Sequence, residues 1–275
     1  MTARIMSTVI FFAAASAFPQ SLPCERVLLP VFGTVNGAYG SVWHTELIGY
    51  NEGAPPVDFA TCLPGLSFEH PVFPPGRTFR PPVADTFGNP VFVYVPQPGA
   101  DKVRFNLRVQ DVSRQAQTWG TTIPVVHESD IFSGPFELLD VPVDARFRSG
   151  LRIYDWDSDG ADPRLVRVRI YDLCGLAIIG DPCSDVPLID TTIAVAGEAF
   201  DGGFPIMPAF TSISDLVGAF PPLANVKPQL TGPNSLRPAA VRIELEPITP
   251  GLRIWAFVSA TNNDTQHVTV IAPSR

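Results

Sequence analysis

The densest cluster of residues that could do chemistry is acidic. Asp155, Asp157 and Asp159 alternate along the chain, a glycine follows, and Asp162 lies just beyond it. Alternate carboxylates before a glycine can surround a hard cation with oxygen ligands, while the glycine permits a sharp turn. An EF-hand loop also needs a bidentate glutamate at its twelfth position, where this chain has Val166. The segment therefore predicts either a calcium site formed by Asp155, Asp157, Asp159 and Asp162, or a polar hairpin loop.

Tryptophan supplies the second candidate. Aromatic faces are rigid and apolar, so a set of tryptophans can form a platform on which sugar rings stack. Trp156 lies inside the acidic segment and is the best candidate for exposure, which makes it the predicted ligand-binding residue. Core packing is the alternative for every tryptophan. Trp255 and Phe257 alternate with other apolar residues, so we expect their strand to be central and buried on both faces. The four tryptophans are Trp43, Trp119, Trp156 and Trp255.

Side chains for catalysis are sparse. None of the histidines lies in a metalloprotease motif, no serine lies in a nucleophile elbow, and no glycine-rich loop could hold a phosphate. His44 and Glu46 share one face of a predicted strand and could join a metal or acid–base site, or could simply face solvent. We predict no catalytic residue and no enzyme. The four histidines are His44, His70, His127 and His267.

Four cysteines indicate disulfides, because an even count is typical of an exported chain. Three pairings are possible. We predict Cys24–Cys62 and Cys174–Cys183, since each pair then lies inside one proposed domain. A metal site is the alternative for the second pair, but no histidine lies near it in the sequence.

The N-terminus predicts export. Arg4 precedes an apolar run from Ile5 to Ala15, and Ala15-Ser16-Ala17 has the small-residue pattern of a cleavage site. We therefore assign residues 1–17 to a signal peptide and expect a secreted, periplasmic or cell-surface protein. No later segment is apolar enough to span a bilayer. The net charge of −8 argues against nucleic acid and anionic membranes as partners.

The elements that position these residues are strands. Apolar and polar residues alternate over Val103–Val109, Val166–Ile170 and Val241–Leu245, which is the period of a half-buried strand. The 30 prolines and 21 glycines indicate many turns between short elements. One short helix is predicted at Asp215–Ala219, capped by Ser214. Further strands are predicted at Arg26–Phe32, Ser41–Tyr50, Pro90–Val95, Leu151–Tyr154, Ile189–Val195, Arg253–Ala260 and His267–Ile271.

The first and second halves of the chain show similar strand sequences in the same order. The segment from Val103 to Leu107 is similar to that from Val241 to Leu245, and Leu28–Val31 is similar to Leu138–Val141. Short strand sequences can also be similar by chance. We predict an all-β protein with two tandem immunoglobulin-like antiparallel β-sandwich domains, over residues 18–130 and 131–275.

Several segments resemble a group of uncharacterised bacterial secreted proteins with tandem immunoglobulin-like modules. Gly251–Ile271 resembles the C-terminal signature of this group, and Leu151–Asp155 and Val168–Asp172 resemble its middle strands. Leu107–Trp119 and Pro124–Val126 are similar to the end of its first module. The resemblance implies a fold and no activity.

The expected function follows from two observations on the sequence. Its strand patterns predict the fold class clearly, and it contains no recognisable set of catalytic residues. We expect an exported, non-enzymatic structural or adhesive protein that requires no cofactor and whose partner is an extracellular protein or glycan. The first alternative is a carbohydrate-binding accessory module, with calcium at the acidic segment and Trp156 on the sugar. The second is a hydrolase with an unrecognised pair of carboxylates.

Overall fold

The fold is built almost entirely of strands. Every strand pairing in the described part of the chain is antiparallel, which confirms the predicted all-β class. The computed structural model describes residues 24–37, 40–53, 55–58, 62, 72–81, 83, 85–97, 99–114, 120–157, 162–173, 185–196, 207–232 and 235–273. The predicted signal peptide at residues 1–17 lies outside these ranges. No helix among the described residues is long and apolar enough to cross a membrane.

Two sheets form the N-terminal half. Sheet 1 has the strand order β2-β3-β8-β9, with β6 also paired to β3, and sheet 2 has the order β10-β1-β7. A small ribbon, β4-β5, lies beside them. The strands are β1 (Cys24–Leu29), β2 (Thr34–Asn36), β3 (Val42–Asn51), β4 (Val57–Asp58), β5 (Val72–Phe73), β6 (Thr78–Phe79), β7 (Val91–Pro96), β8 (Val103–Asp111), β9 (Thr121–Ile123) and β10 (Val126–His127).

Two four-stranded sheets form most of the C-terminal half. Sheet 3 has the order β15-β12-β19-β20 and sheet 4 the order β11-β18-β13-β14, and a ribbon β16-β17 lies beside them. The elements are β11 (Phe136–Pro142), β12 (Phe147–Asp155), β13 (Arg164–Asp172), β14 (Ile189–Val195), β15 (Phe210–Ile213), α1 (Leu216–Ala219), β16 (Gln229–Gly232), β17 (Ser235–Arg237), β18 (Ala240–Pro247), β19 (Ile254–Asn262) and β20 (Val268–Ile271).

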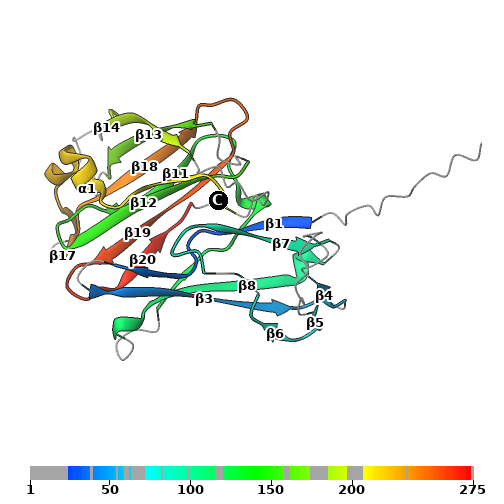
Figure 1. The fold of residues 1–275 in the computed structure, drawn as a ribbon. Coiled ribbons are helices and arrows are strands. Elements are labelled where there is room, and N and C mark those ends of the chain that lie inside the picture. The colour runs from blue at the N-terminus through cyan, green and yellow to red at the C-terminus, as the bar shows by residue number, and fades with distance from the viewer. Residues whose placement is uncertain are drawn as a thin grey trace, which may run out of the picture.

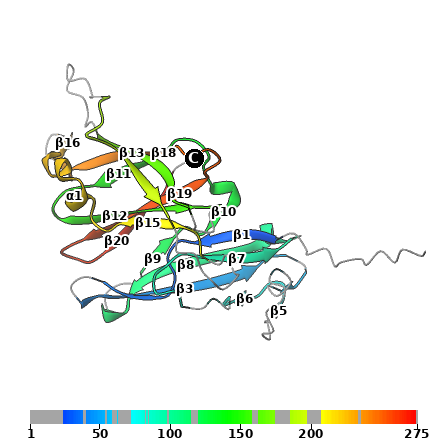
Figure 2. The same ribbon diagram turned by 45° about the horizontal axis from the view of Figure 1, so that its top comes forward.

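The four sheets lie one on another in the order 1, 2, 3, 4. Figures 1 and 2 both show β1 between the strands of sheet 1 and those of sheet 3. The central strands of the two middle sheets are buried on both faces. In β1, Val27, Leu28 and Leu29 are all fully buried. In β19 the run from Ile254 to Val258 is buried at every position, which confirms the prediction of a central strand apolar on both faces.

Sheet 3 contributes to two cores. Leu151 and Ile153 of β12 point toward sheet 4 and lie in its core, together with alternate residues of β19. The opposite face carries Tyr154, Trp255 and Phe257, which belong to the core of the N-terminal half. This difference follows from the two-residue period of a strand, because successive side chains point to opposite faces. The two halves therefore share one aromatic layer.

The segment between the halves is hydrogen-bonded to both of them. β10 pairs with β1 through Leu28↔Val126 and Val27↔His127. Five residues after β10, the Phe132 amide donates to the Ile254 carbonyl at 2.9 Å and the Ile254 amide donates back at 2.9 Å. The segment is thus anchored on each side of the junction. The domain boundary after residue 130 stays a prediction.

The pairing of strands shows how the two halves correspond. β1 pairs with β7 as β11 pairs with β18, and β3-β8-β9 follow one another in a sheet as β12-β19-β20 do. The predicted match of Val103–Leu107 with Val241–Leu245 is therefore wrong by one strand. Those residues lie in β8 and β18, whereas the strand in the position of β8 is β19. Strands of similar composition misled the sequence comparison, because alternation alone does not tell one strand from its neighbour.

Local predictions had mixed outcomes. The disulfide Cys24–Cys62 is present, with its Cα atoms 5.9 Å apart. Cys174 and Cys183 lie outside the described residues. The short helix is present, but Asp215 caps it in place of Ser214, because the Asp215 side chain accepts a hydrogen bond from the Val217 amide.

Candidate functional site

The predicted calcium segment lies at the end of β12, where its carboxylates contact arginines. Asp155 is fully buried and accepts a hydrogen bond from Arg164 at 3.1 Å. Asp157 accepts two from Arg253, at 2.7 and 2.5 Å, and Arg26 of β1 lies 3.5 Å away. Each guanidinium supplies the positive charge that a cation would bring.

Two carboxylates of this segment, Asp155 and Asp157, already have positively charged partners. The hydrogen bonds from Arg253 lower the pKa of Asp157, and the same bonds raise the pKa of Arg253. Arg253 also contacts Glu128 at 2.7 Å. Asp162 is exposed, and Asp159 lies outside the described residues. Across the described ranges, no group of three or more His, Cys, Asp or Glu side chains is placed to hold a metal ion. Calcium binding by all four carboxylates stays an untested prediction.

Trp156 is buried, so the expectation that it is exposed is wrong. Its side chain is 1% exposed and meets the Phe92 ring edge-to-face at 5.1 Å. The Arg26 guanidinium lies over the ring with its central carbon 5.0 Å from the centroid. The ring therefore offers no open face to a sugar. Trp255 is also buried, Trp43 packs against the N-terminal core, and Trp119 lies outside the described residues.

His44 and Glu46 do not form an acid–base pair with each other. The Nδ1 atom of His44 lies 2.9 Å from the Thr34 hydroxyl. Glu46 is held between Arg80, at 2.6 Å, and Arg108. The two side chains share a sheet face as predicted, but each is engaged by a neighbour on another strand.

His127 was not singled out from the sequence, and it contacts Glu25 across the β1–β10 pairing with 2.7 Å between Nδ1 and Oε1. His267 is exposed, and His70 lies outside the described residues.

The outer face of sheet 4 carries cross-strand ion pairs, as the alternation of arginines and glutamates predicts. Arg169 contacts Glu244 at 2.5 Å and Glu246 at 2.7 Å, and Arg242 contacts Glu137 at 2.5 Å. These residues are partly exposed and satisfy one another, so the face is a solvated ion-pair network and does not offer a basic patch.

Arg152 departs from the expected solvent-facing pattern. It points from β12 toward the N-terminal half, where it donates to the Gly88 carbonyl at 2.9 Å. This side chain therefore contributes to the contact between the halves.

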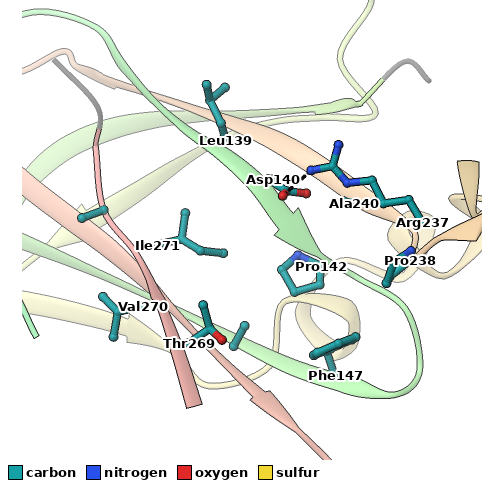
Figure 3. A pocket seen from close by; sticks show the side chains of 12 residues that line it. Leu139, Asp140, Pro142, Phe147, Arg237, Pro238, Ala240, Thr269, Val270 and Ile271 are labelled. Atoms are coloured by element: carbon teal, nitrogen blue, oxygen red, sulfur yellow. Dashed lines mark ion pairs between the residues drawn. The ribbon is translucent and has the colours of Figure 1, made fainter. Parts of the chain in front are cut away.

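A cavity of about 410 Å³ lies between β11 and β20. Figure 3 shows Ile271 and Thr269 on one side of it, and Pro142 and Phe147 on the other. Its lining residues are Leu139, Asp140, Pro142, Phe147, Arg237, Pro238, Ala240, Ala260, Thr269, Val270, Ile271 and Ala272. Most of these side chains are apolar, but Asp140, Arg237 and Thr269 also bring polar atoms to the lining, so the cavity suits a small apolar group with polar groups beside it.

A charged pair and a bent strand border this cavity. Asp140 and Arg237 form an ion pair, drawn as a dashed line in Figure 3. The Asp140 backbone is left-handed, with φ +65°, where the register of β11 with β18 shifts between Leu138 and Val141. A bulge of this kind turns Leu139 outward, and 45% of its surface is exposed. No sequence pattern predicts this site, because its residues come from five separate segments.

The edge of sheet 4 beside this cavity is formed by β11. Within the described residues, β11 pairs with β18 on one side and with no strand on the other. An edge strand presents unpaired N–H and C=O groups, and the cavity adds an apolar wall next to them.

Comparison of the chain with protein-family models, curated proteins and solved structures finds no match, so the site is defined by its geometry alone.

Proposed function

We propose that this chain is an exported, non-enzymatic interaction protein of structural or adhesive role, built from two immunoglobulin-like sandwiches. One observation carries the proposal. The central strands of sheets 2 and 3 are buried on both faces at Val27–Leu29 and Ile254–Val258, and aromatic side chains of sheet 3 pack in the core of the N-terminal half. The two halves therefore form one body whose surfaces keep a fixed spacing. A fixed spacing suits a protein that connects other molecules, because binding then costs little ordering of the chain.

Contacts across the junction support this rigidity. The Tyr154 hydroxyl donates to the Pro30 carbonyl at 2.8 Å, and the Thr121 hydroxyl donates to the Val268 carbonyl at 2.6 Å. Burial of Tyr154 raises the pKa of its hydroxyl, which therefore stays protonated as a donor. Together with the paired linking segment, these bonds restrain the junction from several directions.

The pairing of the acidic side chains with arginines supports a binding role for this protein more than a catalytic one. Asp157, Glu46 and Glu244 each accept hydrogen bonds from arginine. The bonds from Arg253 lower the pKa of Asp157, which makes this carboxyl a weak proton donor. Burial of Trp156 removes the residue on which the sugar-binding alternative depended. Export is supported by the Cys24–Cys62 disulfide, which oxidising compartments favour, and by the signal-like sequence at residues 1–17.

An adhesion assay tests the proposal. Beads coated with residues 18–275 are passed over cells of the producing species under flow, and albumin-coated beads serve as the control. We expect retention that saturates and that soluble protein competes away, with no turnover of a panel of glycosides and esters. Retention no better than that of albumin would contradict the proposal, as would turnover that a single Asp→Asn or Glu→Gln substitution abolishes.

A further inference from the structure

The outer edge of β1 is paired with another strand, whereas the corresponding edge of β11 has no strand partner within the described residues. In the N-terminal half the chain leaves β9, passes Pro124 and Val125, and adds β10 to the outer edge of β1. β11 corresponds to β1 and β20 corresponds to β9, since their partners in the two sheets match. In the described part of the C-terminal half, no strand lies on the outer edge of β11.

The edge of β1 shows which side chains a strand such as β10 provides when it pairs there. Val126 of β10 pairs with Leu28 and is 1% exposed, and Val125 packs against the same core. The next residue, His127, points the other way and contacts Glu25. A short segment with β-branched apolar residues therefore seals the gap between the two sheets in the N-terminal half.

The open edge has the features that such a segment would cover. The cavity of about 410 Å³ lies between β11 and β20, the strands that correspond to β1 and β9, and in the other half β10 follows β9 and pairs with β1. Leu139 is 45% exposed at its border.

We propose that the outer edge of β11 binds an extended strand of a partner polypeptide, antiparallel to β11, with a β-branched apolar side chain in the cavity. The inference rests on the proposed interaction function and names its partner class. Main-chain hydrogen bonds to the edge supply affinity, and the cavity selects the side chain. The occupant follows from the molecule itself, because β10 fills the corresponding place in the other half.

A peptide with the sequence of residues 121–128 is the first probe. It carries the valine pair of β10 and is labelled at its N-terminus, and its binding to the protein spanning residues 18–275 is followed by fluorescence anisotropy. A second peptide carries aspartate in place of Val126. We expect saturable binding of the first peptide and about tenfold weaker binding of the second, because a charge would enter an apolar cavity.

A matched pair of protein variants locates the site. Leu139→Lys changes the exposed leucine at the cavity border, while Leu165→Lys changes an equally exposed leucine of β13, with exposures of 45% and 43%. Both should keep the wild-type circular dichroism and melting temperature. We expect Leu139→Lys to weaken peptide binding at least about tenfold. Leu165→Lys should leave the binding unchanged.

Hydrogen exchange provides the second readout. Bound peptide should slow amide exchange in β11 and β20 and leave β1 unaffected. Absence of saturable binding would overturn the inference and would mean that the bulge in β11 blunts this edge against pairing. Binding that persists in Leu139→Lys, or protection confined to β1, would also overturn it.

Sedimentation and the bead assay separate the remaining outcomes. A dimer of the protein alone, dissociated by Leu139→Lys, would identify a second copy of the chain as the occupant and would overturn the proposal of a different partner. Beads coated with Leu139→Lys should lose retention if β11 is the adhesive edge. Full retention by these beads, without peptide binding by wild type, would reject the strand site and leave the proposed function standing.

Discussion

The N-terminal and C-terminal halves share a strand order but close their sandwiches by different means. The N-terminal half is closed by β10 along the edge of β1 and carries the Cys24–Cys62 disulfide. In the described part of the C-terminal half, β13 and β14 extend the outer sheet on one side, while β11 has no strand partner on the other. The comparison shows that a short segment such as β10 decides whether a sheet edge is paired, and we propose that the edge of β11 binds a partner strand.

Both halves also depend on the layer between them. Tyr154, Trp255 and Phe257 are core residues of the N-terminal half although they belong to sheet 3. Neither half can therefore expose this layer without leaving a large apolar surface in water. Four predictions, from the largest expected effect to the smallest, test how far the two halves are alike and how far each depends on the other.

The largest effect should come from Tyr154→Ala. The side chain is 1% exposed, and its loss removes both the hydroxyl bond to Pro30 and the ring packing against Phe257. We expect the free energy of unfolding to fall by about 3–5 kcal/mol in urea titrations. Tyr154→Phe keeps the ring and should cost only about 1 kcal/mol. Equal losses in the two variants would show that the shared layer contributes little.

Removal of the disulfide should distinguish the halves. The double variant Cys24→Ser, Cys62→Ser opens a loop with a sequence separation of 38 residues and should lower stability by about 2–4 kcal/mol. Hydrogen exchange should accelerate in β1 and β7, which the bond anchors, more than in β11 and β18. Uniform acceleration in all four strands would show that the halves unfold only as one unit.

The ion pair of Asp157 with Arg253 should give a smaller, pH-dependent effect. Arginine lowers the pKa of Asp157 in the native state. The unfolded state therefore binds the proton more tightly, so the pair stabilises the protein above the ordinary aspartate pKa and ceases to do so as the pH falls through the native value. Both side chains are about one-third exposed, which limits the contribution to about 1 kcal/mol.

Urea titrations of Asp157→Asn and wild type at neutral and acidic pH provide the measurement. The variant should be less stable at neutral pH, and the difference should vanish below the native pKa of Asp157. Asp162→Asn, at an exposed position of the same segment, is the control. A deficit of the Asp157 variant that is the same at both pH values would contradict the assignment.

Calcium should have the smallest effect. Because Arg253 and Arg164 already contact Asp157 and Asp155, a cation would have to displace them before it could bind these carboxylates. We expect the melting temperature of residues 18–275 to be the same in calcium and in chelator. A calcium-dependent rise that Asp157→Ala abolishes would show that the acidic segment is a metal site after all.

Much of the secondary structure could be read from alternation. The prediction over Ile189–Val195 matches β14 residue for residue, and β3, β7, β18 and β19 begin or end within three residues of their expected limits. Strands such as β10 and β15 were missed, because two to four residues are too few to show a period. β11 was also missed as a whole strand, since its bulge interrupts the alternation at Leu139 and Asp140.

The candidate site could not be predicted from the sequence. The acidic segment attracted attention because its residue types suit calcium. Arg164, which contacts Asp155, is close in the sequence, but the two arginines that engage Asp157, Arg26 and Arg253, lie about a hundred residues away. The cavity at β11 has no sequence pattern, since Leu139, Phe147 and Ile271 come from three different strands. Contacts between distant segments decide both outcomes, and a local pattern carries no information about them.

By itself, the sequence determined the strand-rich class, the Cys24–Cys62 pairing chosen among three, and the double-sided burial of the strand with Trp255 and Phe257. These features are local, because alternation and apolar content act on a segment whatever it packs against. Only the tertiary structure decided that Trp156 is buried, that arginines contact Asp155 and Asp157, and that β11 has no strand on its outer edge within the described residues. Each of these depends on which segments fold onto which, and burial and pairing are set by that choice.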